Sequence, residues 1–140
     1  MTPIMIGTIE SVVIDYLNTA HPDYPVYMSG ETIPSAQTKY CRFWVIPSNE
    51  TFPVGMGVTA KSRNVGIVQL DVIGLADIGA GETSNVASSF VKFFSRESYA
   101  IPSEDGYLTL KDGVVMDSGK VGESHRGVAR IGYRYDFALK

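Results

Sequence analysis

Cysteine, histidine and long apolar runs are scarce in this sequence, and each scarcity excludes a class of protein. The 140 residues include one cysteine, Cys41, so an internal disulfide framework is impossible. Two histidines and one cysteine give no zinc-ligand spacing. The apolar runs are too short for a membrane span. Residues 1–20 lack the order of a signal peptide, so we expect neither membrane insertion nor secretion.

Positive charge is absent from the first part of the chain. No Lys or Arg precedes Lys39, whereas four carboxylates do. From Lys120 onward, five cations accompany two carboxylates. The net charge of −3 argues against a general nucleic-acid coat. The acidic and basic ends are either two solvated surfaces or complementary contacts between copies in a head-to-tail ring.

Hydrophobic patterning predicts a single α+β domain over residues 1–140. We expect a mostly antiparallel, twisted sheet with two α-helices packed on it and a β-hairpin extension. Apolar residues at helical spacing predict one helix at residues 3–18 and another that begins at Thr83 or Ser84. Residues 40–46 read as a strand, in which we expect Cys41 to be buried.

Two hairpins and an alternating last strand complete the predicted sheet. Residues 51–73 form a long hairpin with a polar, basic turn at residues 61–64. Asp112-Gly113 is predicted to be the tight turn of a second hairpin, because this dipeptide supplies positive φ angles. Residues 129–137 alternate between an apolar face and a face that carries Arg130 and Arg134.

Motifs for catalysis and nucleotide binding are incomplete. Residues 79–84 nearly fit G-x-G-x-x-G, but Ser84 replaces the third glycine, and Glu82 would repel a pyrophosphate. Residues 113–120 miss the spacing of a phosphate loop, and Val121 replaces its Ser or Thr. No G-x-S-x-G nucleophile elbow occurs. We therefore expect no enzyme activity, no catalytic residue, no metal and no cofactor.

One ordered series of segments covers nearly the whole chain. It runs from an opening helix through a proline-led strand at 24–27, a strand at 40–46, the pattern Arg-x-x-Gly-Ile-x-Gln-x-Asp-Val at 63–72, a glycine joint, a helix with phenylalanines at 89–94 and a closing strand at 128–135. In this order the chain resembles the phage tail terminator-like family, minor tail proteins of long-tailed phages and prophages.

The resemblance implies a structural protein of the virion tail, assembled in the cytoplasm of the bacterial host. Such proteins form a ring, typically of six copies, on the head-proximal end of the tail tube. The ring stops tube polymerisation and presents the surface that joins the head. The implied partners are further copies of the chain, the tail tube protein and a head completion or connector protein. DNA only passes through the lumen.

Four cations are candidate contacts with a neighbouring subunit or the tube: Lys61, Arg63, Arg130 and Arg134. The alternative to a contact role is that these four residues are solvated side chains on a strand face. Other functions also remain open. A different head–tail connector or a tail tube subunit would look similar, and a small ligand-binding domain or enzyme would use the loop at residues 79–84. A regulatory protein would need a basic surface and a recognition helix, and the sequence predicts neither.

Overall fold

The computed structural model describes residues 3–28, 30–35, 37–54, 61–75, 80–121 and 124–138. The elements follow in the order α1 (Pro3–Ala20), β1 (Val26–Met28), β2 (Tyr40–Val54), β3 (Lys61–Leu75), α2 (Ala80–Phe94), β4 (Ser98–Ile101), η3 (Pro102–Glu104), β5 (Gly106–Val121) and β6 (Ser124–Ala138). The strands form one sheet in the order β1-β2-β3-β6-β5-β4. Neighbouring strands are antiparallel except β1, which pairs parallel with β2. The predicted α+β class is confirmed.

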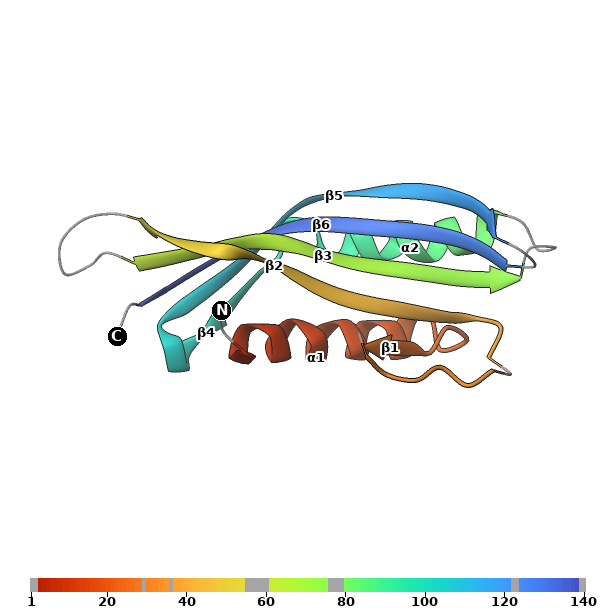
Figure 1. Cartoon of the computed structure of the whole chain (residues 1–140), viewed down its shortest axis with the longest axis horizontal. Helices are drawn as coiled ribbons and strands as arrows, with labels where there is room; N and C mark the ends of the chain where they lie inside the picture. Colours follow the sequence, from red (N-terminus) through yellow and green to blue (C-terminus); the bar gives the residue numbers. More distant parts are fainter. Residues whose placement is uncertain are drawn as a thin grey trace.

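Four long strands determine the shape of the molecule. β2, β3 and β6 have 15 residues each and β5 has 16, whereas an ordinary strand has about 5–6 residues. Figure 1 shows these strands curling side by side along the long axis, with α1 and α2 lying along the same axis. At one end β2 and β3 extend beyond the helices (Figure 1), which is the predicted hairpin extension.

Both helices cover the same face of the sheet and share one core with it. The core combines a stripe of each helix with the inward residues of the strands, including Ile9, Val13, Leu17, Phe43, Leu70, Phe90, Phe94, Ile131 and Tyr133. The helices also touch each other, because the ring of Tyr16 stacks on Phe93 with centroids 4.2 Å apart. Cys41 is fully buried, as predicted, and burial raises the pKa of its thiol to about 12.

The last strand alternates as its sequence predicts. Ala129, Ile131, Tyr133 and Tyr135 are buried, whereas Arg130 is exposed. Tyr133 lies opposite Gly66 in the strand register, and its ring occupies the space above the glycine. A Cβ at position 66 would lie 2.6 Å from Tyr133 Cε2 and 2.5 Å from the Ile46 carbonyl oxygen.

The predicted turn at residues 61–64 is wrong, because these residues begin β3. Lys61 and Arg63 pair across the sheet with Ala138 and Asp136 of β6. The polar side chains that suggested a turn are therefore held by a strand far away in the sequence. The tip of this hairpin lies between Val54 and Lys61, outside the described residues.

The predicted turn at Asp112-Gly113 is also wrong, because β5 runs through it. The strand register shifts between Leu110 and Gly113, so the dipeptide marks a local irregularity. Asp112 accepts a hydrogen bond from Arg96 Nε at 2.7 Å. A Cβ at Gly113 would lie 2.6 Å from Ile131 Cγ1. The glycine thus permits close packing of strand on strand.

The second helix begins at Ala80, before the predicted cap at Thr83 or Ser84. Thr83 is fully buried inside the first turn, and its carbonyl group lies against Gly127 of β6. Tertiary contacts of this kind extend a helix beyond the start that local capping residues indicate. The first helix, Pro3–Ala20, agrees with its prediction to within two residues.

Candidate assembly surface

The candidate site lies on the face of the sheet opposite the helices, which we call the outer face. Side chains alternate along a strand, so the neighbours of the buried Phe43, Leu70 and Ala129 point outward. Six outward residues lie close together on β2, β3 and β6: Arg42, Trp44, Gln69, Asp71, Arg126 and Arg130. Three of the six are arginines, which gives this part of the sheet its positive charge.

A continuous polar network crosses the outer face. Arg130 Nε donates to Gln69 Oε1 at 2.9 Å, and Gln69 Nε2 donates to Asp71 Oδ1 at 2.9 Å. Arg126 Nη2 donates to Asp71 Oδ2 at 2.5 Å. The Asp71 side chain is only 4% exposed, against 41% for Arg126. The arginine therefore covers the carboxylate and balances its charge.

Arg42 adds a further positive charge beside Asp71. The two residues are direct partners across β2 and β3. Arg42 Nη2 donates to the backbone oxygen of Glu31. Among the described residues, no hydrogen-bond partner reaches the buried Nε atoms of Arg42 and Arg126. A buried donor without a partner is costly, so a contact that turned these guanidinium groups toward added acceptors would be favoured.

Two shallow hollows flank this network. One has a volume of about 510 Å³ and is bounded by Tyr40, Arg42, Trp44 and Arg126, among others. The second, of about 490 Å³, lies around Ile46, Ile67 and Gly132. The outer face also exposes four apolar side chains: Ile46, Ile67, Val114 and Met116. Tryptophan, arginine and exposed aliphatic groups together are typical of protein–protein contacts.

A second charged cluster lies at the end of the sheet that projects beyond the helices. Arg63 donates to both carboxylate oxygens of Asp136, from Nε at 2.6 Å and from Nη2 at 3.0 Å. The Arg63 guanidinium lowers the pKa of Asp136 below its ordinary value, and the same hydrogen bond raises the pKa of Arg63. Arg134 Nε lies 3.9 Å from Asp136, and Lys61 Nζ lies 3.5 Å from Asp105. Most of this positive charge is compensated within the chain.

The structure separates the four predicted contact residues into two groups. Lys61, Arg63 and Arg134 share the cluster at the end of the sheet, whereas Arg130 belongs to the network on the outer face. Sequence reasoning missed Arg42 and Arg126, the other arginines of that network. The available signal was Arg42 itself, a single charge that interrupts an otherwise apolar strand.

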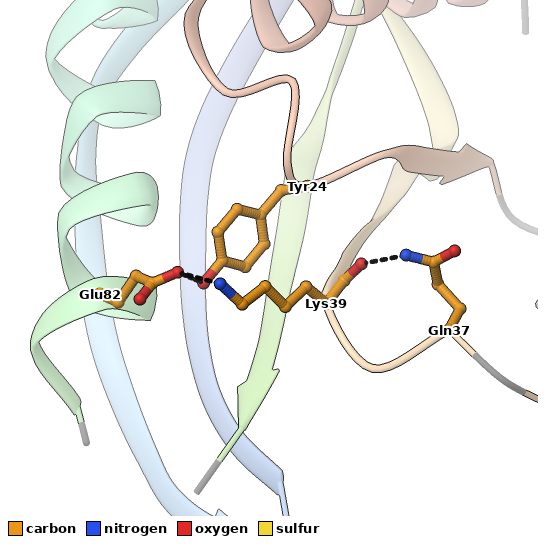
Figure 2. A network of polar contacts seen from close by, with 4 residues as sticks. All are labelled: Tyr24, Gln37, Lys39 and Glu82. Atoms are coloured by element: carbon orange, nitrogen blue, oxygen red, sulfur yellow. Dashed lines mark hydrogen bonds and ion pairs between the residues drawn. The ribbon is translucent and has the colours of Figure 1, made fainter. Parts of the chain in front are cut away.

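A polar network on the helix side ties the start of α2 to the segments around β1. Glu82 Oε1 accepts hydrogen bonds from the Tyr24 hydroxyl at 2.6 Å and from Lys39 Nζ at 3.0 Å (Figure 2). The bond from Tyr24 and then that from Lys39 lower the pKa of Glu82. Burial, followed by the bond to Glu82, raises the pKa of Tyr24. Glu82 is thus engaged internally and stabilises the first turn of the helix.

A serine, a histidine and a tyrosine meet between the two helices. Ser89 Oγ lies 2.6 Å from the Tyr16 hydroxyl and 3.1 Å from His21 Nε2. Burial lowers the pKa of His21. Ser89 lies within α2, and the hydroxyl bonds both to the last turns of α1 and to the residue that follows it. These hydrogen bonds join α2 to the C-terminal part of α1, and we call the three residues Tyr16, His21 and Ser89 the clasp between the helices.

Within the described ranges, no three side chains of His, Cys, Asp or Glu are placed to hold a metal ion. No helix in the same ranges is both long and apolar enough to cross a bilayer. In the loop that nearly fits a nucleotide motif, Gly79 lies outside the described residues, and Gly81 belongs to α2.

Comparison with known proteins finds structures of similar fold and indicates no function. No family model and no curated protein sequence matches the chain. Ten solved chains match by structure. One of them, a protein named only by a sequence identifier, aligns with 98% of this chain and 96% of its own length at a TM-score of 0.68 and 17% identity. Similarity at this identity shows a shared fold.

Proposed function

We propose that the protein is a structural component of a phage or prophage tail that acts without catalysis. Copies of the chain form a closed ring, of about six subunits by family resemblance, on the head-proximal end of the tail tube. The ring ends tube polymerisation and presents the surface to which a head completion or connector protein binds. DNA passes through its lumen.

The observation that carries this proposal is that the two sides of the molecule differ. One side is a layer of two helices, and the other is an outer face with arginines, a tryptophan and exposed aliphatic side chains. A closed ring requires two unlike, complementary patches on every copy. A two-layer fold with one uncovered sheet face provides such a pair of patches.

Native mass spectrometry over a range of protein and salt concentrations tests the oligomer. A closed species near six copies supports the proposal, whereas an open series of sizes favours a tube subunit. Purified tail tubes then test the site of action. We expect the protein to bind only at tube ends and to stop elongation, and binding along the tube wall would contradict the proposal.

Charge reversal at single residues tests the role of the outer face. We expect Arg130→Glu and Arg134→Glu to weaken assembly without unfolding the chain, because both side chains lie at the surface of the sheet. The readouts are oligomer size and the length of tails assembled with each variant. If tails assembled with each variant had normal length, Arg130 and Arg134 would not take part in the contact.

A further inference from the structure

The exposed side of α1 is acidic and uncompensated. The helix contains no Lys or Arg. Asp15 is exposed and Glu10 is half-buried. No ion pair joins either carboxylate to another residue in the described part of the chain. Among the described residues, neither of these two negative charges has an ion-pair partner, and they lie on the two flanks of the exposed side of the helix, about 140° apart around its axis.

The outer face carries the opposite imbalance. Arg130 donates to the neutral amide of Gln69, and Arg42 donates to a backbone carbonyl group. Within the described ranges, neither guanidinium pairs with a carboxylate. Helix layer and outer face are on opposite sides of the sheet, so these opposite charges cannot meet inside one copy. They can meet between copies.

We propose that the outer face of one copy receives α1 of the next copy, with Arg42 and Arg130 contacting Glu10 and Asp15. This inference rests on the ring proposed above and names its contact. The occupant is a second copy because the charges left over on one side of the chain complement those left over on the other. The contact is heterologous, so repeating it does not stop at a dimer: it gives a closed ring where the rotation between copies closes, and an open filament where it does not.

Apolar groups provide the rest of the contact. Exposed ion pairs alone contribute little, about 0–1 kcal/mol each, and mainly set orientation. Trp44 lies across Gln69 from Arg130, and Ile46 and Ile67 offer further apolar surface one step along the strands. On α1, Ile14 is half-buried and lies one helical turn after Glu10. Tryptophan and arginine are the residues most often found at the energetic centre of an interface.

A charge-swap mixture tests the contact. One variant, Arg42→Glu with Arg130→Glu, makes the outer face acidic, and the other, Glu10→Lys with Asp15→Lys, makes α1 basic. Each variant alone would place like charges in contact, so we expect its dissociation constant to rise by at least about tenfold. Mixed in equal amounts, the two variants can alternate around a ring. We expect rings of even copy number with equal amounts of each variant, seen by native mass spectrometry.

The control is Ser88→Glu, which adds a carboxylate at an exposed position of α2 that borders neither the outer face nor the hollow beside Tyr16 of α1. We expect this variant to assemble like the unaltered chain. Circular dichroism of every variant checks that it is folded.

Two results would overturn the contact while leaving the ring in place. Either a folded variant with one altered face assembles normally, or the two variants do not assemble when they are mixed. An unaltered chain that stays monomeric at millimolar concentration would overturn the contact between free copies, whereas capture by tube ends tests the function separately.

Tryptophan fluorescence gives a second readout of the same contact. Trp44 is the only tryptophan of the chain and lies on the outer face, so its emission reports directly on that face. We expect a blue shift that follows assembly as the concentration rises, and that is lost in the Glu10→Lys, Asp15→Lys variant. Assembly with unchanged emission would mean that copies meet through another surface.

Discussion

At position 66 the sheet leaves room for a hydrogen atom and for nothing larger. A methyl group there would contact both the ring of Tyr133 and the carbonyl group of Ile46. Because Tyr133 is buried and donates from its hydroxyl to Asn64 Oδ1 at 2.7 Å, it cannot move aside without losing that bond. We expect Gly66→Ala to lower the free energy of unfolding by about 1–3 kcal/mol, measured by urea denaturation.

Gly7→Ala is the matched control for that substitution. Gly7 lies in α1, and no atom would lie within 4 Å of an added Cβ. Alanine in a helix is more favourable than glycine by about 0.5–1 kcal/mol, so we expect this variant to be more stable than the unaltered chain. If both variants lost stability equally, the close approach at Gly66 would not be the cause.

Arg63 and Arg130 differ in what their charge does inside the monomer. Arg63 is held by both oxygens of Asp136, whereas Arg130 bonds to a neutral amide. Arg63→Glu would set two carboxylates side by side, so we expect it to destabilise the monomer and to raise the pKa of Asp136. We expect Arg130→Glu to leave monomer stability nearly unchanged. Thermal unfolding at low protein concentration checks both, and equal losses would contradict the assignment of Arg63 to an internal pair.

At the scale of elements, the clasp between the helices predicts a response to pH. Burial lowers the pKa of His21 below its ordinary value of 6.5, so the folded chain favours the neutral ring. The unfolded chain binds the proton at a higher pH than the folded chain does. The stabilising effect of His21 is therefore complete above about pH 6.5, and it is lost as the pH falls toward the lower folded pKa. We expect His21→Asn to lose less stability than the unaltered chain between about pH 7 and pH 5.

Chemical denaturation at a series of pH values gives this difference. Comparing the two chains at each pH cancels the contributions that they have in common. Parallel stability curves would show that His21 does not titrate differently in the two states. A steeper loss in the variant would reverse the assigned direction of the pKa shift.

Elements with their own periodic pattern were predictable, and boundaries set by distant contacts were not. The spacing of Ile9, Val13 and Leu17 fixes α1, and the alternation of residues 129–137 fixes β6. Residues 61–64 look like a turn because all four are polar, so the segment lacks the alternation of apolar and polar residues that indicates a strand. Asp136 of β6 makes it a strand by pairing with Arg63. The turn predicted at Asp112-Gly113 was wrong for the same reason. Arg96 donates a hydrogen bond to Asp112, and Ile131 packs against Gly113, both from other elements.

At the scale of the whole molecule, the candidate surface could be predicted only in part. Strand alternation predicts that Arg130 faces outward, whereas the proximity of Arg42 and Arg126 to Arg130 depends on the strand order β2-β3-β6. Charge imbalance along the sequence indicated an acidic start and a basic end. The fold places Glu10 and Asp15 of α1 on one side of the sheet and Arg126 and Arg130 of β6 on the other, which the linear sequence cannot show.

The length of the strands relative to the helices leads to the last prediction. β3 and β6 have a neighbour on each side and pair over their full length, including the part that projects beyond the helices. β1 and β4 are short edge strands of three and four residues. Protection from hydrogen exchange follows hydrogen bonding and local stability. We expect amides at residues 67–72 and 128–133 to exchange slowest, and those of β1 and β4 to exchange faster.

The amides at residues 62–64 decide whether the projecting end belongs to the rigid sheet. In the structure they pair with both β2 and β6, and Arg63 is fixed by Asp136. We expect clear protection there, measured residue by residue with NMR, and reduced protection in Asp136→Ala. Exchange at the rate of an unstructured segment would mean that the sheet ends where the helices end. The cations at Lys61 and Arg63 would then be solvated, as their local sequence alone suggests.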